Sequence, residues 1–327
     1  MATGAPPVVW VLTDGKAGDE QPLIGLAEAM GAEPILRHVA PRRGYTWLMP
    51  WGPIDPKDAP SKAGSPLAPP FPEICLATGR RAVPYLRRLK ALSPSTFCVL
   101  FKDPRTRRHG ADLLIVQQHD APRGSNVLVV TTAPNRLLPE RLAEAHAAFA
   151  DVLAPLPAPR VAVLVGGNGR HHRFTEADID RFLEGLKAKC EDGCGLMITT
   201  SRRTPALLAK ALAGLANRPG VHLWDGAGRN PLLAYLAWAD EIVVTADSTN
   251  MIGEAAALGV PVQLFHPSGG HPKIDSLIAA LSREAVIGRF PDAPAHGSGS
   301  PVNSTPGLAE EILKRCRLTK ARPARPS

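Results

Sequence analysis

The sequence is poor in cysteine, in aromatic residues and in long apolar runs, and each shortage excludes a class of protein. No stretch approaches the ~18 consecutive apolar residues of a membrane-spanning helix, and the N-terminus shows neither the basic flank nor the apolar core of a signal peptide. The five cysteines are an odd and scattered set, without the spacing of a metal site or a disulfide framework. We therefore expect a cytoplasmic protein with reduced thiols.

The charge balance is basic, but the residues that usually accompany nucleic-acid binding are scarce. Aromatic residues make up 5% of the chain, and the net charge is +8. Part of the surplus lies in the tail from Lys314 to Arg325. It suits an anionic partner such as a nucleotide diphosphate or an acidic lipid surface, although a solvated tail is the simpler explanation. We expect no nucleic-acid partner, and a peripheral position at the inner face of the membrane stays an alternative.

Two nucleotide-binding motifs are also missing. The loop from Thr13 to Gln21 contains glycine and Lys16 but lacks the G-x-x-x-x-G-K-[ST] spacing of an ATP-binding P-loop. G-x-G-x-x-G is absent as well, which counts against a dinucleotide oxidoreductase. The adjacent His171 and His172 point apart in an extended chain, which disfavours a metal pair. We expect no cofactor and no metal.

Short apolar runs alternate with helical segments along the chain. Runs such as Val8–Leu12 fit strands of a parallel sheet that is buried on both faces, and the pattern restarts at Val161–Val165. We expect an α/β fold of two doubly wound, Rossmann-like domains facing a cleft, with ligands beyond the carboxyl ends of the strands. The expected units are an N-terminal domain over 1–153, a C-terminal domain over 160–295, and a C-terminal helix and basic tail over 303–327 that packs back on the first domain.

Proline is concentrated in two segments. Eight prolines fall between residues 50 and 72, a density that opposes regular structure and indicates a long surface loop or a flap. Beside it, Trp47, Leu48, Met49 and Trp51 form an apolar edge that suits a membrane or a lipid-linked substrate, and equally packing on its own domain. The second segment, residues 154–159, is interpreted as the interdomain linker.

The stretch from Asp247 to Pro261 carries the strongest functional signal. A strand ends in a polar turn, and the free N–H groups and positive dipole end of the following helix form an anion site. An ordinary α/β turn with a surface glutamate is the alternative. The stretch is similar to the donor-binding motif of GT-B glycosyltransferases, over roughly residues 160–265. That resemblance implies phosphate contacts from Ser248, Thr249 and Asn250, and a ribose contact from Glu254.

Two further turns follow strands of the same expected sheet. Gly166-Gly167-Asn168-Gly169 has few side chains, so its backbone N–H groups can approach phosphate. Arg202 and Arg203 follow the strand Leu196–Thr199 and can hold phosphate with a bidentate fork. Each turn alone is a weak signal. Because three such turns end three strands of one sheet, we expect them to meet at one edge and form a pyrophosphate pocket.

A series of short motifs extends in order along nearly the whole chain: Asp14–Gly18 with Gln21, Thr78–Arg81, Lys102–Arg105, His119-Asp120, Asn126-Val127, Gly166–Asn168, Thr200–Pro205 and Asp247–Pro261. Together they resemble the mitochondrial-fission Elm-type family, a plant and proteobacterial group with a GT-B-like fold. The resemblance implies the fold more firmly than an activity, because the plant members are regarded as adaptors that help to recruit a dynamin-type fission protein.

Together these features favour a nucleotide-sugar-dependent glycosyltransferase with a metal-independent mechanism. The C-terminal domain would bind the diphosphate, with Arg202, Arg203 and Lys16 neutralising the developing charge. Asp14, Asp19, Asp120 and His119 are the candidates for deprotonating the acceptor, and Asp19 and His119 are favoured among them. Some GT-B enzymes have a histidine in the corresponding first loop, and this chain departs from them by lacking one there. The expected partners are a nucleotide-diphosphate sugar and an acceptor left open, a lipid-linked or membrane-surface molecule among the options. A non-catalytic adaptor and a nucleotide-sugar epimerase are the alternatives.

Overall fold

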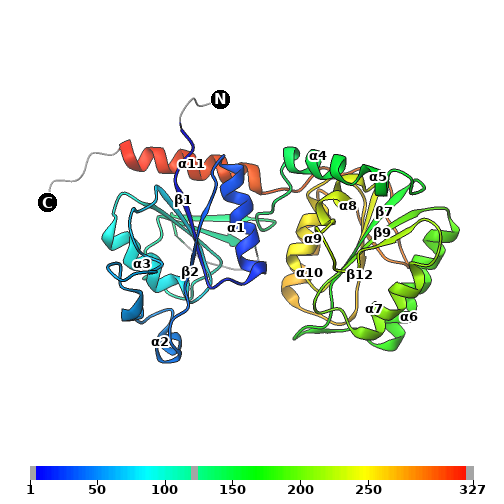
Figure 1. The fold of residues 1–327 in the computed structure, drawn as a ribbon, viewed down its shortest axis with the longest axis horizontal. Coiled ribbons are helices and arrows are strands. Elements are labelled where there is room, and N and C mark those ends of the chain that lie inside the picture. The colour runs from blue at the N-terminus through cyan, green and yellow to red at the C-terminus, as the bar shows by residue number, and fades with distance from the viewer. Residues whose placement is uncertain (1–4, 119–123, 322–327) are drawn as a thin grey trace. The chain divides into compact units, whose positions relative to one another are not determined.

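The computed structural model describes residues 5–118 and 124–321 of the 327-residue chain. The chain forms two compact units: the first combines residues up to Arg136 with the segment from Ser304 onward, and the second runs from Leu137 to Asn303. Each unit contains a six-stranded sheet covered by helices (Figure 1). Within the described ranges, no helix is both long enough and apolar enough to cross a membrane.

The first sheet has the order β2-β1-β3-β4-β5-β6, and all its neighbouring strands are parallel. Alternate side chains of β1 enter opposite cores, Val11 on one face and Trp10 on the other, because helices cover both faces. The strand order reverses between β1 and β3, where doubly wound sheets bind ligands. The strands are β1 (Val9–Thr13), β2 (Ile35–His38), β3 (Ile74–Thr78), β4 (Phe97–Phe101), β5 (Leu113–Gln117) and β6 (Val127–Val130).

Helices from both ends of the chain cover one face of this sheet. Helix α1 (Ala17–Ala29) contacts α11 (Thr305–Ala321), and Leu26 and Ile312 lie in the same core. The C-terminal helix therefore belongs to the first unit. Helix α3 (Ala82–Leu92) supplies Leu86 to the core on the other face.

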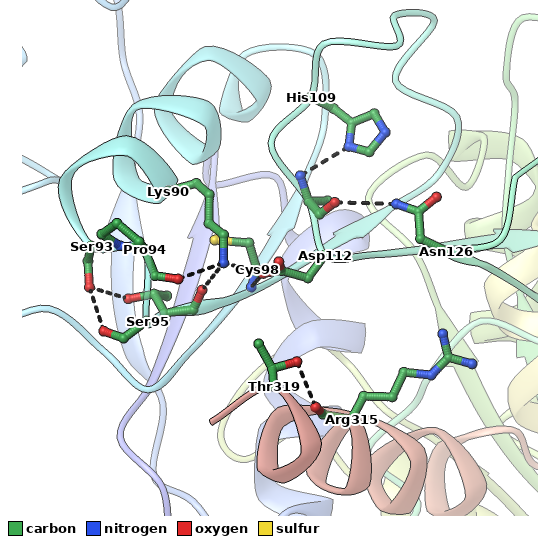
Figure 2. A network of polar contacts seen from close by, with 12 residues as sticks. Lys90, Ser93, Pro94, Ser95, Cys98, His109, Asp112, Asn126, Arg315 and Thr319 are labelled. Atoms are coloured by element: carbon green, nitrogen blue, oxygen red, sulfur yellow. Dashed lines mark hydrogen bonds and ion pairs between the residues drawn. The ribbon is translucent and has the colours of Figure 1, made fainter. Parts of the chain in front are cut away.

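A partly buried polar network ties α3 to the amino ends of β4 and β5 (Figure 2). Lys90 Nζ donates to Asp112 Oδ2 at 2.8 Å and to the Thr96 carbonyl at 2.9 Å, and the Cys98 N–H donates to Asp112 Oδ2 at 2.7 Å. Burial raises the pKa of the Cys98 thiol to about 12. The network lies at the edge of the sheet opposite the loops expected to bind ligands, and it holds the strands in place.

The proline-rich segment is packed on its own domain. It follows α2 (Arg43–Leu48) and contains a single 3-10 turn, η1 (Pro56–Asp58). The buried carboxylate of Asp55 accepts hydrogen bonds from Arg42 Nη2 at 2.7 Å and from the Lys57 N–H at 3.1 Å, and the Arg42 guanidinium holds the pKa of Asp55 well below its usual range. Met49 and Leu67 are buried, so these side chains pack on their own domain.

The second sheet has the order β10-β9-β7-β11-β12-β14, again with all neighbours parallel, and its order reverses between β7 and β11. Its strands are β7 (Arg160–Val165), β9 (Gly195–Thr200), β10 (Val221–Leu223), β11 (Glu241–Thr245), β12 (Val262–Phe265) and β14 (Ile287–Arg289). Two short antiparallel strands, β8 (His172–Arg173) and β13 (Ser268–Gly269), lie outside it. The helices are α4 (Pro139–Ala148), α5 (Ala150–Leu153), α6 (Glu176–Glu191), α7 (Ala206–Leu215), α8 (Leu232–Trp238), α9 (Thr249–Ala256) and α10 (Pro272–Leu281).

The predicted α/β fold with two Rossmann-like domains is confirmed, but the units divide at a different place from the expected linker. Trp238 Nε1 donates to the His146 carbonyl at 3.0 Å, and Leu142 packs against the second core, so α4 and α5 belong to the second unit. The stretch 154–159 also lies inside that unit, where the Gly195 N–H donates to the Pro157 carbonyl at 3.0 Å. The alanine-rich sequence of α4 suits packing on either of the two domains, so the sequence alone does not fix the boundary between them.

Candidate functional site

Three polar turns meet at the switch point of the second sheet, which is the place between β7 and β11 where the strand order reverses. The turn after β7 contains Gly166 and Gly167, the turn after β9 contains Arg203, and the turn after β11 contains Asp247 and Ser248. In doubly wound sheets the crevice beyond the carboxyl ends of the strands at this point is the usual ligand site.

The carboxylate of Asp247 is fully buried and joins the three turns. Its Oδ1 accepts a hydrogen bond from Thr245 Oγ1 at 2.7 Å. Its Oδ2 accepts one from the Gly167 N–H at 3.1 Å and pairs with Arg203 Nη2 at 2.9 Å. Asp247 was expected only to mark the start of the phosphate turn, and it is the residue that holds the site together.

The two glycines of the β7 turn are required by close packing. A Cβ on Gly166 would overlap the Asp247 carboxylate, and one on Gly167 would overlap the Arg203 carbonyl. Their N–H groups, expected to approach phosphate, already donate to Thr245 Oγ1 at 2.7 Å and to Asp247. The role of the glycines visible in the structure is therefore to admit the neighbouring turns.

Of the other polar residues in these turns, Asn168 is hydrogen-bonded within the protein, whereas Arg202 is exposed. The Asn168 N–H donates to the Arg203 carbonyl at 3.0 Å, and its Oδ1 accepts from the Phe174 N–H at 2.9 Å. Arg202 is exposed, and no carboxylate among the described residues pairs with it. Arg202 is thus a cation at this edge that an anionic ligand can recruit.

Helix α9 begins at this edge without a side-chain cap. Ser248 is its N-cap residue and makes no capping hydrogen bond, and Thr249 and Asn250 form its first turn. The amides at the start of a helix lack intrahelical partners, and the helix dipole favours negative charge there. An uncapped N-terminus at the same sheet edge as the exposed Arg202 is suited to an anion.

Glu254 lies on the same helix and is half-buried. No hydrogen bond or ion pair to its side chain occurs within the described part of the chain, and burial raises its pKa to about 7. A carboxylate taken from water without partners is costly unless a ligand supplies hydrogen-bond donors. Glu254 therefore has an unmet capacity to accept hydrogen bonds.

Histidines line the neighbouring loops. The rings of His171 and His271 lie 4.5 Å apart. Burial lowers the pKa of His172, while the charge of Asp247 opposes that shift. Among residues 5–118 and 124–321, no group of three or more histidine, cysteine or acidic residues is arranged to hold a metal ion.

In the first unit, the expected site residues form ion pairs at the β1/β3 switch point. Lys16 Nζ and Arg81 Nη1 lie 2.7 Å and 3.6 Å from Asp14 Oδ2. Asp19, proposed as a base from the sequence, pairs with Lys102. The other candidate base, His119, lies outside the described residues.

A histidine–glutamate pair at the same edge was missed by sequence reasoning. His38 ends β2, and its Nε2 lies 2.5 Å from Oε2 of Glu20 in the first turn of α1. Thr13 Oγ1 donates to the same oxygen at 3.0 Å, so the carboxylate is fixed from two sides. The His38 side chain is 52% exposed, which leaves its Nδ1 available. The available signal was a histidine at the carboxyl end of a strand, but its glutamate partner is separated from it by a whole helix.

The strand orders and the two parallel sheets, with polar sites at their switch points, define a two-domain α/β protein of GT-B-like fold. The UDP-GlcNAc 2-epimerase from Methanocaldococcus jannaschii superposes with a TM-score of 0.54 and 11% identity, covering 95% of this chain and 99% of that one. At this identity the likeness concerns the fold.

The family follows from sequence comparison. Residues 17–316 match the family model of mitochondrial fission ELM1, and the chain belongs to this family. Mitochondrial fission protein ELM1 of Arabidopsis thaliana is 28% identical over 272 residues, which cover 74% of this chain and 64% of that protein. An uncharacterised protein of Rickettsia prowazekii (strain Madrid E) is 29% identical over 221 residues, or 63% and 60% of the two chains. The matches thus span less than two thirds of either relative.

Proposed function

We propose that this protein is a nucleotide-sugar-dependent glycosyltransferase whose second domain binds the nucleotide diphosphate without a metal ion. The observation that carries the proposal is Glu254, a half-buried carboxylate that no hydrogen bond or ion pair reaches within residues 5–118 and 124–321, on the helix whose uncapped N-terminus lies at the switch point. One ligand with a diphosphate next to a diol would satisfy both groups. A nucleoside diphosphate has that composition.

The diphosphate is assigned to the start of α9. The amides of its first turn and the guanidinium of Arg202 supply donors and positive charge, with Thr249 and Asn250 beside them. Arg203 already neutralises the buried charge of Asp247, so that carboxylate does not repel the phosphates with a full uncompensated charge. In this arrangement the glycine turn shapes the site, and Arg202 and the helix bind the anion.

The ribose is assigned to Glu254. Two neighbouring hydroxyls can donate to the two oxygens of one carboxylate, and hydrogen bonds to the charged form lower a carboxyl pKa. Binding would therefore restore to Glu254 the hydrogen bonds that burial denies it.

The base is assigned to His38. Glu20 accepts the hydrogen bond from Nε2, which leaves Nδ1 to take the proton of an acceptor hydroxyl. The acceptor oxygen then bonds to the anomeric carbon as the bond from that carbon to the diphosphate oxygen breaks. His38 suits this role better than Asp19, because the Asp19 carboxylate is already paired with Lys102.

Calorimetric titration with nucleotide sugars tests the binding step. We expect wild-type protein to bind a UDP- or GDP-sugar and Glu254→Ala to lose at least about tenfold in affinity, because a hydrogen bond to a charged group contributes about 1.5–3 kcal/mol. Glu184→Ala, which removes an exposed glutamate of α6, is the matched control and should bind like wild type. Absence of binding to every nucleotide sugar would instead favour an adaptor.

An epimerase is the second candidate, because the superposed Methanocaldococcus jannaschii protein is a UDP-GlcNAc 2-epimerase. It would use the same nucleotide site but would need no acceptor. NMR analysis of products after incubation with a nucleotide sugar alone separates the two: inversion at a sugar carbon indicates the epimerase, whereas turnover that requires an added acceptor indicates the transferase.

A further inference from the structure

The first unit contains a pocket built from the loops after β3 and β4 and from the start of the proline-rich segment. It encloses about 230 Å³. The pocket has a basic part and an apolar part, and neither enters the function proposed above. Its lining residues are Pro50, Trp51, Gly79, Arg80, Val83, Leu100, Phe101, Lys102, Asp103, Pro104 and Arg105.

The basic part contains more cations than its acids can neutralise. Arg80, Lys102 and Arg105 line the pocket against one carboxylate, Asp103, which accepts a hydrogen bond from the backbone N–H of Arg105 at 2.8 Å. Lys102 pairs with Asp19. Within the described ranges, no carboxylate pairs with the guanidinium of Arg80 or of Arg105, and both residues are exposed. Two guanidinium charges are thus left without a carboxylate in the described part of the chain and can attract an anion.

The loop after β4, which carries Lys102 and Arg105, is held in an unfavourable conformation. Lys102 and Arg105 have φ angles of 68° and 54°, a left-handed region that L-residues other than glycine, asparagine and aspartate rarely enter. The Lys102 N–H is tied to the Ile115 carbonyl at 2.9 Å. Such strained residues concentrate at ligand-binding loops, where the fold fixes the direction of a side chain.

The apolar part continues from the pocket onto exposed aromatic residues. Trp51 is 65% exposed although it lines the pocket, and Trp47 and Leu48 of α2 are 82% and 53% exposed. Arg87 Nη2 fixes the backbone at Trp51 by donating to its carbonyl at 3.2 Å. Arg80 Nη2 donates to the Thr46 carbonyl at 3.4 Å, which places α2 beside the basic part. Exposed tryptophans beside arginines are typical of surfaces at the lipid–water interface.

We propose that this pocket binds the phosphate of a lipid at a membrane surface. The phosphate contacts Arg80, Lys102 and Arg105, and Trp47, Leu48 and Trp51 enter the boundary between headgroups and acyl chains. A soluble anion would use the basic part and leave the exposed tryptophans unexplained, whereas a lipid phosphate uses both. The inference goes beyond the proposed transferase and does not depend on nucleotide-sugar binding.

Vesicle binding by the full chain tests the proposal. We expect the protein to bind phosphatidylcholine vesicles that contain phosphatidic acid far more strongly than vesicles of phosphatidylcholine alone, with a blue shift of tryptophan fluorescence. Arg80→Ala and Arg105→Ala should each weaken binding about fivefold, as expected for one cation at an anionic surface. Lys210→Ala, which removes an exposed cation of the second unit, should leave binding unchanged.

Matched apolar variants test the second part of the surface. Leu48→Ala should weaken binding severalfold, whereas Leu207→Ala, at a leucine of α7 that is 52% exposed, should not. Equal effects of Leu48→Ala and Leu207→Ala would overturn the proposal, and so would equal effects of the two arginine variants and Lys210→Ala. Equal binding to the two kinds of vesicle would overturn it as well. Titration with inorganic phosphate is the remaining arm: saturation that depends on Arg80 and Arg105, without vesicle binding, would show a soluble anion site and refute the lipid assignment.

Discussion

Replacement of Glu254 by glutamine should make the protein more stable and a poorer binder of nucleotide sugars. Burial raises the pKa of this carboxyl from 4.5 to about 7. The folded state therefore disfavours the ionised form that the unfolded chain adopts freely. A shift of about 2.5 pH units corresponds to ~3 kcal/mol at most, and partial exposure reduces this to about 2 kcal/mol. Glutamine has nearly the same shape and carries no charge to desolvate.

The sign of this effect depends on pH in a definite way. Because the folded pKa is raised, the penalty is absent below the unfolded value of 4.5 and complete above about pH 7. Urea denaturation at pH 8.5 should therefore show Glu254→Gln more stable than wild type by about 2 kcal/mol, and at pH 4.5 the two should be nearly equal. Glu184→Gln, at an exposed glutamate, should change neither value.

Affinity should change in the opposite direction. The ionised carboxylate accepts hydrogen bonds from two hydroxyls, so wild-type affinity for a nucleotide sugar should rise as pH increases through about 7. The glutamine variant should bind at least about tenfold more weakly at pH 8.5 and lose that pH dependence. A variant with lower stability at pH 8.5, or with unchanged affinity, would contradict the assignment of Glu254 as a ligand-binding group.

Four further variants test the rest of the site. Arg203→Ala should destabilise the fold by about 1–3 kcal/mol because it leaves the buried Asp247 without its cation, whereas Arg202→Ala should preserve stability in urea titrations and weaken nucleotide binding. Gly167→Ala should destabilise by about 1–3 kcal/mol, since the added methyl group overlaps a backbone carbonyl; an unchanged urea midpoint would contradict this. His38→Ala should lower kcat of the proposed transfer about 10²–10⁴-fold while leaving nucleotide-sugar affinity in calorimetry unchanged.

The sequence predicts the sheets well because their information is local. A run such as Glu241–Thr245 is apolar enough to be buried on both faces and ends at polar residues, and the structure places β11 at these residues. The capping box at the start of α6 is equally local: Thr175 Oγ1 accepts from the Asp178 N–H, and the Asp178 carboxylate accepts from the Thr175 N–H. The meeting of three turns at one edge also follows from parallel strand direction alone.

The remaining features depend on contacts between distant residues. The pairing of His38 with Glu20 spans 18 positions and requires β2 to lie beside β1, and no local sequence pattern predicts it. The position of α4 in the second unit depends on two contacts: Trp238 donates to a carbonyl of α4, and Leu142 of α4 packs on the core of that unit. The sequence of the helix does not show which of the two domains supplies such contacts. Tertiary packing decides both, and it acts on residue types that are common in any surface helix or strand end.

The buried Asp247 explains why a glycine-rich turn occurs here without any of the usual nucleotide-binding motifs. In a P-loop the turn amides bind the phosphates directly, so the glycines must leave those amides free. Here the Gly166 and Gly167 amides donate to Thr245 and Asp247, and a protein carboxylate takes the place that a phosphate would occupy. Any phosphate at this edge must then depend on the amides of α9 and on Arg202. The glycines of this turn are therefore explained by their packing against Asp247 and Arg203, and the proposed anion site depends on the next helix instead of on the glycine turn.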